Sequence, residues 1–448
     1  MTTDSHPSDE KFKVILVGGG TAGLATAHFL ERAKKEGWAP SYLQVTVYER
    51  NEEESNSVRY PLQLSHDARS ALQTILSPHS NGSLVSQSNY GITHGGVNIV
   101  NPDLSHLYSN VKHQNEQPQW VHRKVLKDVL SEGVNIVKGK RVIRVREVEG
   151  KFEVVFEDGG NELADLVVGA DGIGSLVRSQ THPSFPNFPL LPYVLVQFKL
   201  ATPIAQLPVM LNKDSQNIIL GNQCNSLHTI PLHGNELPHM TPRSAITLSD
   251  QGPFAEPDST VLAVQQALRD PNTGYVLVRM YLNVSGEGAG AGAGWEDLTE
   301  AAWIDKILNI LRNDGTDKGL VEVVENDLIP GTITATGIVS NGPGKHVPYS
   351  NGKVVLVGDA MHAVPPTNGN GVAAALKDAQ GLVETLLGCS EMAGGAGPIA
   401  SLLPQTYHAS LTRSEIYLKE SLHLLEISNQ SGLSGFIHKS TLRLMDMF

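Results

Sequence analysis

Short apolar runs alternate with polar and helical patterns in the first part of the chain. Residues 14–17 and 45–48 are apolar and rich in β-branched side chains, and residues 22–35 between them have the apolar spacing of a helix with one buried face. A strand, a helix and a strand in this order are typical of a parallel sheet. Apolar runs at 166–168 and 354–357 predict two further buried strands, so the pattern indicates an α/β fold.

The middle of the chain has a different pattern, with more prolines and alternating apolar positions. Alternation of this kind predicts an antiparallel sheet with long loops. The expected strands are Tyr193–Leu200, Gln216–Leu220 and Tyr275–Val284. Ser285–Gly294, rich in glycine and alanine, predicts a flexible surface loop. From residue 403 onward, apolar positions at helical spacing predict a closing helix or a pair of helices.

These patterns divide the chain into parts. We expect a disordered N-terminus at 1–10, a first part of a dinucleotide-binding domain at 11–185, an antiparallel-sheet substrate domain at 186–325, the second part of the first domain at 326–400, and a C-terminal helical segment at 401–448. A domain that is interrupted and later resumed explains how two nucleotide-type segments lie more than 300 residues apart.

The composition and charge of the chain disfavour several classes of partner. The chain has 448 residues, enough for two or more cores, and its net charge of −12 disfavours nucleic acid and anionic membrane surfaces as partners. The N-terminus lacks an apolar signal region, and no apolar run approaches the ~20 residues of a membrane span. The two cysteines, Cys224 and Cys389, are too few for a disulfide framework. We therefore expect a cytoplasmic protein that acts on a small molecule, and a monomer and a homodimer both remain open.

A glycine-rich turn gives the first chemical signal. Gly18, Gly20 and Gly23 have the G-x-G-x-x-G spacing directly after the first strand and before the helix. In this motif the first glycine permits the tight turn, the second lets a pyrophosphate approach the backbone, and the third lets the helix pack closely on the strand. Glu49 ends the second strand, where a carboxylate binds the hydroxyl groups of an adenosine ribose. The alternative is a glycine-rich turn in an ordinary α/β domain.

Two later segments repeat the theme of a strand that ends in an acid. Asp171-Gly172 follows the run at 166–168, and Asp359 follows the run at 354–357. After Asp359 come two prolines, a loop and an alanine-rich helix opened by Gly371, whose first amides attract negative charge. The alternatives are a helix cap for Asp359 and a common turn dipeptide for Asp171-Gly172.

Together these three segments resemble the class A, single-component flavoprotein monooxygenases of the p-hydroxybenzoate hydroxylase fold group. The N-terminal glycine motif, the D-G-x-x-S-x-x-R segment from Asp171 to Arg178 and the late Gly358-Asp359 all match that family, as does Val121-His122-Arg123 at the start of a helix. Within the group, the stretches at 45–50 and 58–64 are similar to tetracycline-inactivating monooxygenases and their fungal relatives. The resemblance implies a Rossmann-like FAD-binding domain interrupted by a substrate domain.

The resemblance also implies a role for individual residues. Glycines 18, 20 and 23 would hold the FAD pyrophosphate, Glu49 the adenosine ribose, and Asp359 the ribityl chain or pyrophosphate. The remaining cofactor residues that it implies are Arg50, Arg123, Asp171, Pro366, Gly369, Asn370, Gly371 and Val372. Arg123 is alternatively a solvated charge, and Arg178 is as readily a structural partner as a cofactor contact. Asn370 stands where the family often has glutamine, and no metal site is predicted.

The activity that the resemblance implies is an NAD(P)H-consuming monooxygenation. NADPH or NADH would dock transiently, because only one complete G-x-G-x-x-G is present. The reduced FAD would react with O₂ through a C4a-hydroperoxide, and one oxygen atom would enter an aromatic or polycyclic substrate. An epoxidase, a Baeyer–Villiger enzyme, a reductase and a non-catalytic binding module on the same fold are the alternatives. The tryptophans do not form the signature of flavin halogenases.

A side chain that activates the substrate is the least determined feature. Deprotonation of a phenol needs a base near the reacting ring. Our candidate is His228, on an expected strand at 227–232, and Gln216, His233 and His94 are further candidates. The chain has 17 histidines, so a surface or structural role is the usual alternative for any one of them.

Overall fold

The structure is a computed structural model of the whole chain. It describes residues 11–52, 61–87, 96–111, 119–185, 187–202, 206–211, 216–221, 225–232, 275–284, 295–342, 344–349, 353–389, 398–430 and 432–445. The expected disordered N-terminus, the loop Ser285–Gly294, His94 and His233 lie outside the described residues.

A five-stranded parallel sheet forms the centre of the first domain. Its strand order is β17 (Val354–Leu356), β11 (Leu166–Gly169), β1 (Phe12–Val17), β2 (Leu43–Glu49) and β7 (Ile136–Lys138). Of the two expected later strands, β11 pairs with β1 and β17 pairs with β11, and the five strands run in one direction. The strands β11 and β17 are buried at every position, and their residues are apolar or glycine, as expected for strands covered on both faces.

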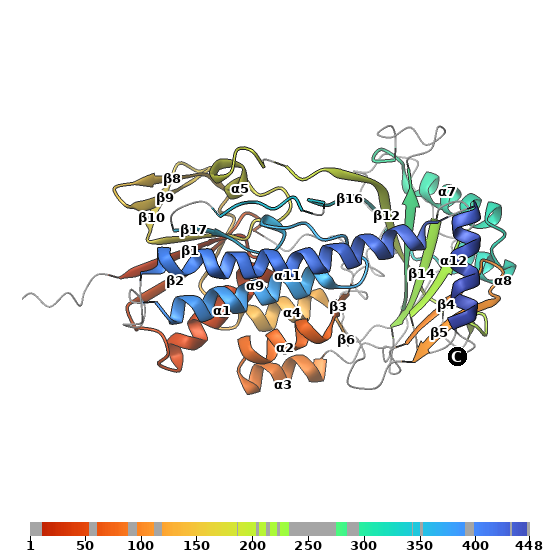
Figure 1. Cartoon of the computed structure of the whole chain (residues 1–448), viewed down its shortest axis with the longest axis horizontal. Coiled ribbons are helices and arrows are strands. Elements are labelled where there is room, and N and C mark those ends of the chain that lie inside the picture. The colour runs from red at the N-terminus through yellow and green to blue at the C-terminus, as the bar shows by residue number, and fades with distance from the viewer. Residues whose placement is uncertain are drawn as a thin grey trace, which may run out of the picture.

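Helices cover one face of this sheet, and a small sheet covers the other. The helices are α1 (Thr21–Lys35), α2 (His66–Ile75), α3 (Pro78–Gln87), α4 (Arg123–Ser131) and α9 (Asn370–Leu387) (Figure 1). Against the opposite face lie β8 (Val142–Val148), β9 (Lys151–Phe156) and β10 (Asn161–Ala164). The Tyr48 ring of β2 lies 4.5 Å from the Phe156 ring of β9, and the Tyr48 hydroxyl donates to Glu162.

A seven-stranded sheet forms the second domain. Its order is β16 (Thr334–Val339), β12 (Leu190–Leu200), β15 (Tyr275–Asn283), β14 (Asn225–Leu232), β13 (Gln216–Leu220), β4 (Gly96–Val100) and β5 (His106–Val111). All pairs are antiparallel except β13 with β4. The strands β4, β5 and β16 belong to this sheet but lie outside 186–325, the range expected for the substrate domain. Segments before β12 and after β15 therefore both contribute to the second domain.

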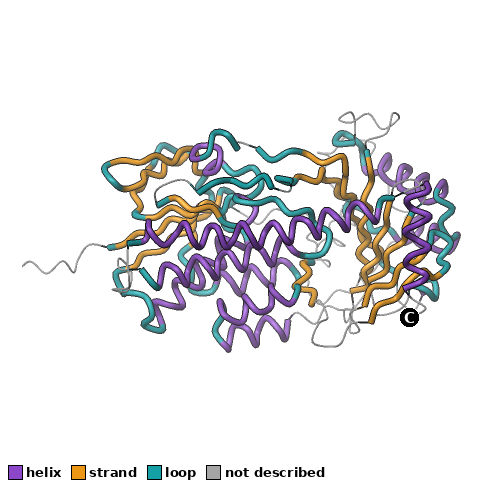
Figure 2. Tube along the Cα trace, viewed as in Figure 1, coloured by secondary structure: helices purple, strands orange, loops and turns teal. Residues whose placement is uncertain are grey.

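The two faces of this sheet have different environments. The face that carries Val196, Phe198 and Val278 packs on α7 (Glu300–Asn313) and α8 (Lys318–Asp327). Residues one position along point to the opposite face. There Leu195 and Tyr281 pack with Leu425, and this face looks toward the first domain (Figure 2).

The C-terminal part is a pair of helices, as the spacing predicts. The first, α11 (Ile399–Ser428), runs along α9 and extends from the first domain to the seven-stranded sheet (Figure 1). The second, α12 (Gly432–Met445), packs on β5 through Leu442. The predicted fold class is confirmed: an α/β, Rossmann-like domain is interrupted by an antiparallel-sheet domain and closed by C-terminal helices. Within the described ranges, no helix has the length and apolar character needed to cross a membrane.

Candidate active site

The acids and glycines of the three motifs lie at one edge of the parallel sheet. Val17 pairs with Tyr48 and with Gly169, and Gly169 pairs with Leu356, so β1, β2, β11 and β17 end side by side. Clefts at the carboxyl ends of parallel strands are where such folds bind ligands. The structure thus brings together segments that are separated by more than 300 residues in the chain.

The glycine-rich turn has the geometry that the motif predicts. Gly18 has φ +111° and its N–H donates to the Tyr48 carbonyl at 2.9 Å; a Cβ there would lie 2.4 Å from the Ala170 oxygen. A Cβ on Gly23 would lie 2.1 Å from the Gly18 oxygen, whereas a Cβ on Gly20 would meet no atom within 4 Å. Gly18 and Gly23 are therefore needed for packing, and the backbone at Gly20 is open to a ligand.

The start of α1 is suited to an anion. Gly20 is its N-cap and provides no side-chain hydrogen bond, and its first turn contains no acidic residue. The last turn carries Arg32, Lys34 and Lys35. Amides at a helix start attract negative charge, and a pyrophosphate fits that requirement.

Glu49 lies against this turn. Its Oε2 accepts from the Gly19 N–H at 2.9 Å, and its Oε1 accepts from the Asn51 N–H at 2.9 Å. A carboxylate has about four lone-pair sites, so the two bonds leave capacity for the hydroxyls of a ribose. The neighbouring Arg50 is exposed.

The Gly358-Asp359 turn comes close to the first segment. Gly358 has φ +59°, and a Cβ there would lie 2.9 Å from the Ala22 Cβ of α1. Asp359 has an exposed side chain, yet burial in the surrounding protein raises its pKa, while the charges of His362 and Arg123 act in the opposite sense. The Asp359 side chain is thus accessible, and Arg123 lies near enough for its charge to act on it. The exposed Arg123 at the start of α4 therefore belongs to the same cleft.

Asp171 has a structural use in this fold. Its carboxylate accepts from the N–H groups of Leu176 (2.7 Å) and Val177 (3.1 Å) and from the Ser175 hydroxyl, and so caps α5 (Leu176–Thr181). The capping accounts for an acid at this position. Contact with FAD or NADPH stays a prediction for Asp171.

Arg178 joins the second motif to the third. Its side chain is fully buried and donates to the carbonyls of Phe185 (3.0 Å), Ala360 (2.9 Å) and Ile173 (2.6 Å). The Ala360 bond fixes the turn that carries Asp359. Arg178 is thus a structural residue of the cleft and lies beneath it.

We predict that Arg178→Met lowers the free energy of unfolding by about 3 kcal/mol or more, because three buried carbonyls lose their donor. The control is Arg312→Met, which removes a surface ion pair with Glu325 and is expected to cost less than about 1 kcal/mol. Urea denaturation measures both. Equal losses would show that Arg178 does not brace the cleft.

The loop before α9 is held from two sides. Gly369 has φ +77°, and a Cβ there would lie 2.5 Å from the Gln63 oxygen. The Pro366 carbonyl accepts from the Tyr281 hydroxyl at 2.7 Å. The Asn370 amide donates to Glu420 Oε2 at 3.0 Å, so it is directed to α11; the backbone of Gly371 and Val372 is half-buried at the helix start. Contacts between this loop and a flavin ring stay a prediction.

A cavity of about 970 Å³ adjoins the loop. It is bounded by the inner face of the seven-stranded sheet, by Thr367, Asn368 and Asn370 of the loop, and by α11. Its sheet-side lining consists of Val97, Ile99, Gln216, Ile218, His228 and Tyr281. Asn98, between two lining residues, points to the other face, where its amide donates to the Met210 carbonyl. A space of this size accepts a multi-ring molecule.

The structure places His228 in this cavity wall. Its Nδ1 lies 3.3 Å from the Gln216 amide, and its ring centroid lies 4.9 Å from that of Tyr281. Burial, together with the charge of Arg279, lowers the pKa of His228 to about 3. A phenol has a pKa of about 10, and each unit of the difference costs about 1.4 kcal/mol. Its position suits substrate contact, but its basicity disfavours proton abstraction.

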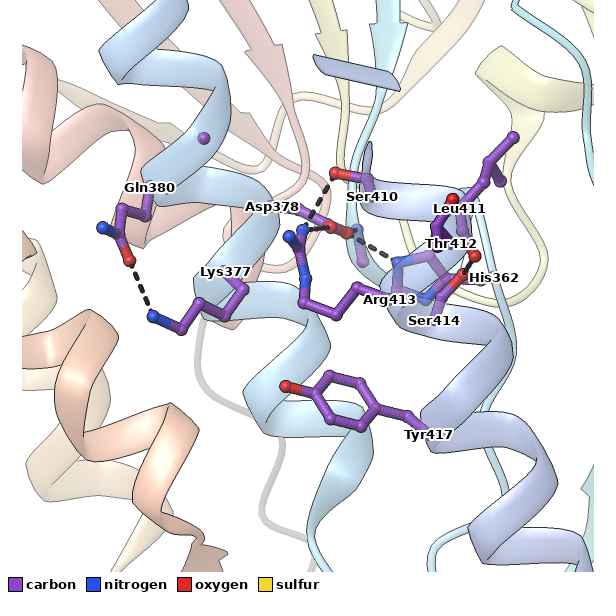
Figure 3. Close-up of polar contacts among 12 residues, drawn as sticks. His362, Lys377, Asp378, Gln380, Ser410, Leu411, Thr412, Arg413, Ser414 and Tyr417 are labelled. Carbon is purple, nitrogen blue, oxygen red and sulfur yellow. Dashed lines mark hydrogen bonds and ion pairs between the residues drawn. The ribbon is translucent and has the colours of Figure 1, made fainter. Parts of the chain in front are cut away.

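Sequence reasoning missed a cluster of three ionisable residues behind the cleft. Asp378 of α9 accepts from His362 Nε2 at 2.6 Å and from Arg413 of α11 at 2.9 Å (Figure 3). Asp378 and His362 are each 2% exposed. The available signal was an acid on the apolar face of a helix, four residues after Ala374 and four before Leu382.

The His362–Asp378 pair predicts a pH dependence of stability. Burial alone would raise the pKa of Asp378 and lower that of His362, but the pairing reverses both shifts, with a further contribution from Arg413 at Asp378 and from Asp359 at His362. A carboxyl with a lowered folded pKa stabilises above its unfolded pKa of about 4, and a histidine with a raised folded pKa stabilises below about 6.5 and loses this effect as pH rises. The loss of stability in His362→Gln should therefore be largest between about pH 4 and 6.5. Urea denaturation at acidic, intermediate and alkaline pH tests this, and a loss independent of pH would contradict it.

Comparison with known proteins agrees with this geometry. The FAD binding domain family matches residues 11–240 and 313–410. The FAD-dependent monooxygenase sor5 of Hypocrea jecorina is 24% identical over 407 residues, which cover 89% of this chain and 80% of that protein.

Two solved structures share the fold. Klebsiella pneumoniae HpxO, complexed with FAD and uric acid, has a TM-score of 0.72 at 16% identity, with 98% of this chain and 95% of that chain covered. The tetracycline destructase Tet(51) has a TM-score of 0.59 at 14% identity, with 97% of each chain covered. The open glycine turn, the helix start without acids and the accessible carboxylate of Asp359 fit FAD. The chain belongs to the FAD binding domain family and is a class A FAD-dependent monooxygenase.

Proposed function

We propose that the protein consumes NADPH or NADH and inserts one oxygen atom of O₂ into an aromatic or polycyclic small molecule. The observation that carries this proposal is the position of the cavity, which is bounded on one side by residues 367, 368 and 370 and on the other by a sheet face with both apolar and polar side chains. A ring system placed there lies next to the loop that the resemblance assigns to the flavin. The structural neighbour HpxO is complexed with uric acid and Tet(51) is named for tetracycline, and both observations support a ring substrate.

Separate groups of residues bind FAD, exclude water and orient the substrate. Gly20, the start of α1, Glu49 and Asp359 bind FAD, which supplies the reaction with O₂. Val97, Ile99 and Ile218 exclude water from the substrate, since water at the reacting centre leads to hydrogen peroxide instead of product. Gln216 and His228 orient a polar group of the substrate.

The test uses FAD-loaded protein, NADPH or NADH, and a panel of aromatic and polycyclic compounds under heavy-isotope O₂. The proposal expects a compound that accelerates flavin reduction and gains one heavy oxygen atom, as measured by mass spectrometry. Gain of oxygen at a double bond or beside a carbonyl would reassign the enzyme to epoxidation or Baeyer–Villiger chemistry. Reduction of a substrate without gain of oxygen would overturn the proposal.

We predict that His228→Leu raises the KM for that substrate about tenfold, because one hydrogen bond to the substrate is lost. The pH profile of kcat should remain unchanged, since an imidazole with a pKa of about 3 does not titrate near neutrality. Steady-state kinetics from pH 6 to pH 9 provide the measurement. Loss of one limb of the profile in the variant would instead assign His228 the role of the base.

A further inference from the structure

A single buried carboxylate holds the turn that carries Asp359. Asp378 Oδ2 accepts from the Gly358 N–H at 3.0 Å and from His362 Nε2 at 2.6 Å. Gly358 directly precedes Asp359, and the His362 N–H donates back to the Gly358 carbonyl at 3.0 Å. Both ends of the turn 358–362 are therefore fixed to one oxygen atom, 16 residues further along the chain from His362.

The other oxygen of Asp378 binds the C-terminal helix. Oδ1 accepts from Arg413 at 2.9 Å, and the same guanidinium group donates to the Ser410 hydroxyl at 3.0 Å (Figure 3). A buried carboxylate without partners is strongly unfavourable, so the anion needs its cationic neighbours. Arg413 reaches it from α11, which lies outside all three cofactor motifs.

Charge and packing together leave the turn little freedom. Gly358 has a positive φ and lies against Ala22 of α1, so a shift of the turn would bring it into that helix. Arg178 holds the Ala360 carbonyl on the other side. Of Ala22, Arg178 and Asp378, only Asp378 is a charged group that accepts a hydrogen bond from the Gly358 N–H, directly before Asp359.

We propose that Asp378 is the positioning residue for Asp359, and that Arg413 completes the cofactor site from the C-terminal helix by neutralising Asp378. The inference rests on the proposed FAD contact of Asp359. It makes α11 part of the FAD site, although α11 contributes no residue to the nucleotide motifs.

The test is a double-mutant cycle on FAD affinity in the full-length protein. Asp378→Asn should weaken FAD binding about 10- to 100-fold in the wild-type background, because charge-assisted hydrogen bonds that set the turn are lost. In an Asp359→Asn background the same exchange should have almost no further effect, since a positioning residue acts through the group it positions. Flavin fluorescence measures affinity, and thermal unfolding of the apoprotein is recorded in parallel.

Arg413 supplies a second pair of variants in case Asp378→Asn does not fold. Arg413→Lys should retain most of the affinity for FAD, and Arg413→Met should lower it about tenfold. Glu384→Gln is the matched control for Asp378→Asn, because Glu384 is an exposed acid on α9, the helix that carries Asp378. This variant should bind FAD as the wild type does.

The outcomes separate the two ideas. Unchanged affinity in Asp378→Asn, or equal losses in both backgrounds, would overturn the positioning role. If Asp378→Asn does not fold, unchanged affinity in Arg413→Met would overturn it. Wild-type affinity in Asp359→Asn, beside a loss in Asp378→Asn, would instead overturn the FAD contact of Asp359 and show that Asp378 acts on the cleft by another route.

Discussion

Gly20→Val is expected to abolish tight FAD binding while the apoprotein stays folded. A Cβ on Gly20 meets no protein atom within 4 Å, and φ −81° with ψ −175° is extended backbone that valine adopts readily. The added methyl groups would occupy the space through which a pyrophosphate reaches the amides of α1. Loss of two charge-assisted hydrogen bonds, about 3 to 6 kcal/mol, weakens binding about 100- to 10,000-fold.

Two other glycines give the controls for this variant. Gly82→Val, at an equally open position in α3, should leave both stability and FAD binding unchanged. Gly23→Val should prevent folding, because its Cβ would lie 2.1 Å from the Gly18 oxygen. Apoprotein unfolding and FAD titration measure these effects. A Gly20→Val protein that binds FAD with wild-type affinity would contradict the proposed site.

The second large effect is expected from Ile218→Trp, which should stop oxygen transfer without loss of FAD. Ile218 lines the cavity and is half-buried on the inner face of β13. The larger side chain would displace a substrate ring by more than about 1 Å, and such a displacement lowers kcat/KM about 100-fold. NAD(P)H oxidation in the variant should yield hydrogen peroxide instead of product.

Ile143→Trp is the matched control, because Ile143 is 43% exposed on the small three-stranded sheet. It should have wild-type kinetics and wild-type FAD content. Unchanged kcat/KM in Ile218→Trp would show that the substrate binds outside the cavity.

The sequence predicts those parts of the site that depend on local geometry. A glycine with positive φ, a strand that ends in an acid and a helix without a first-turn acid are all encoded within a few residues, as at Gly18, Glu49 and the start of α1. The sequence also predicts that the motif segments are adjacent, because parallel strands that end in such motifs share one sheet edge. The predicted fold class is confirmed, and the FAD contacts of these residues stay a prediction.

Features that depend on side chains far apart in the sequence could not be predicted in this way. Asp378 and Arg413 meet because α9 and α11 pack together, and the two residues are 35 positions apart. The Tyr281–Pro366 hydrogen bond joins two domains over 85 positions. The pairing of β4 with β13 similarly unites segments from different parts of the chain. The basicity of His228 depends on its burial and on Arg279, neither of which is visible in the residues beside it.

A crystal structure of the protein with bound FAD would show whether the segments around Gly20, Glu49 and Asp359 hold one FAD molecule. We expect the pyrophosphate at the start of α1, with the carboxylate of Glu49 within hydrogen-bond distance of the adenosine ribose. Asp359 should contact the ribityl or pyrophosphate part of the same molecule. An FAD molecule that contacts only one of these two carboxylates, or that lies elsewhere in the protein, would contradict the account.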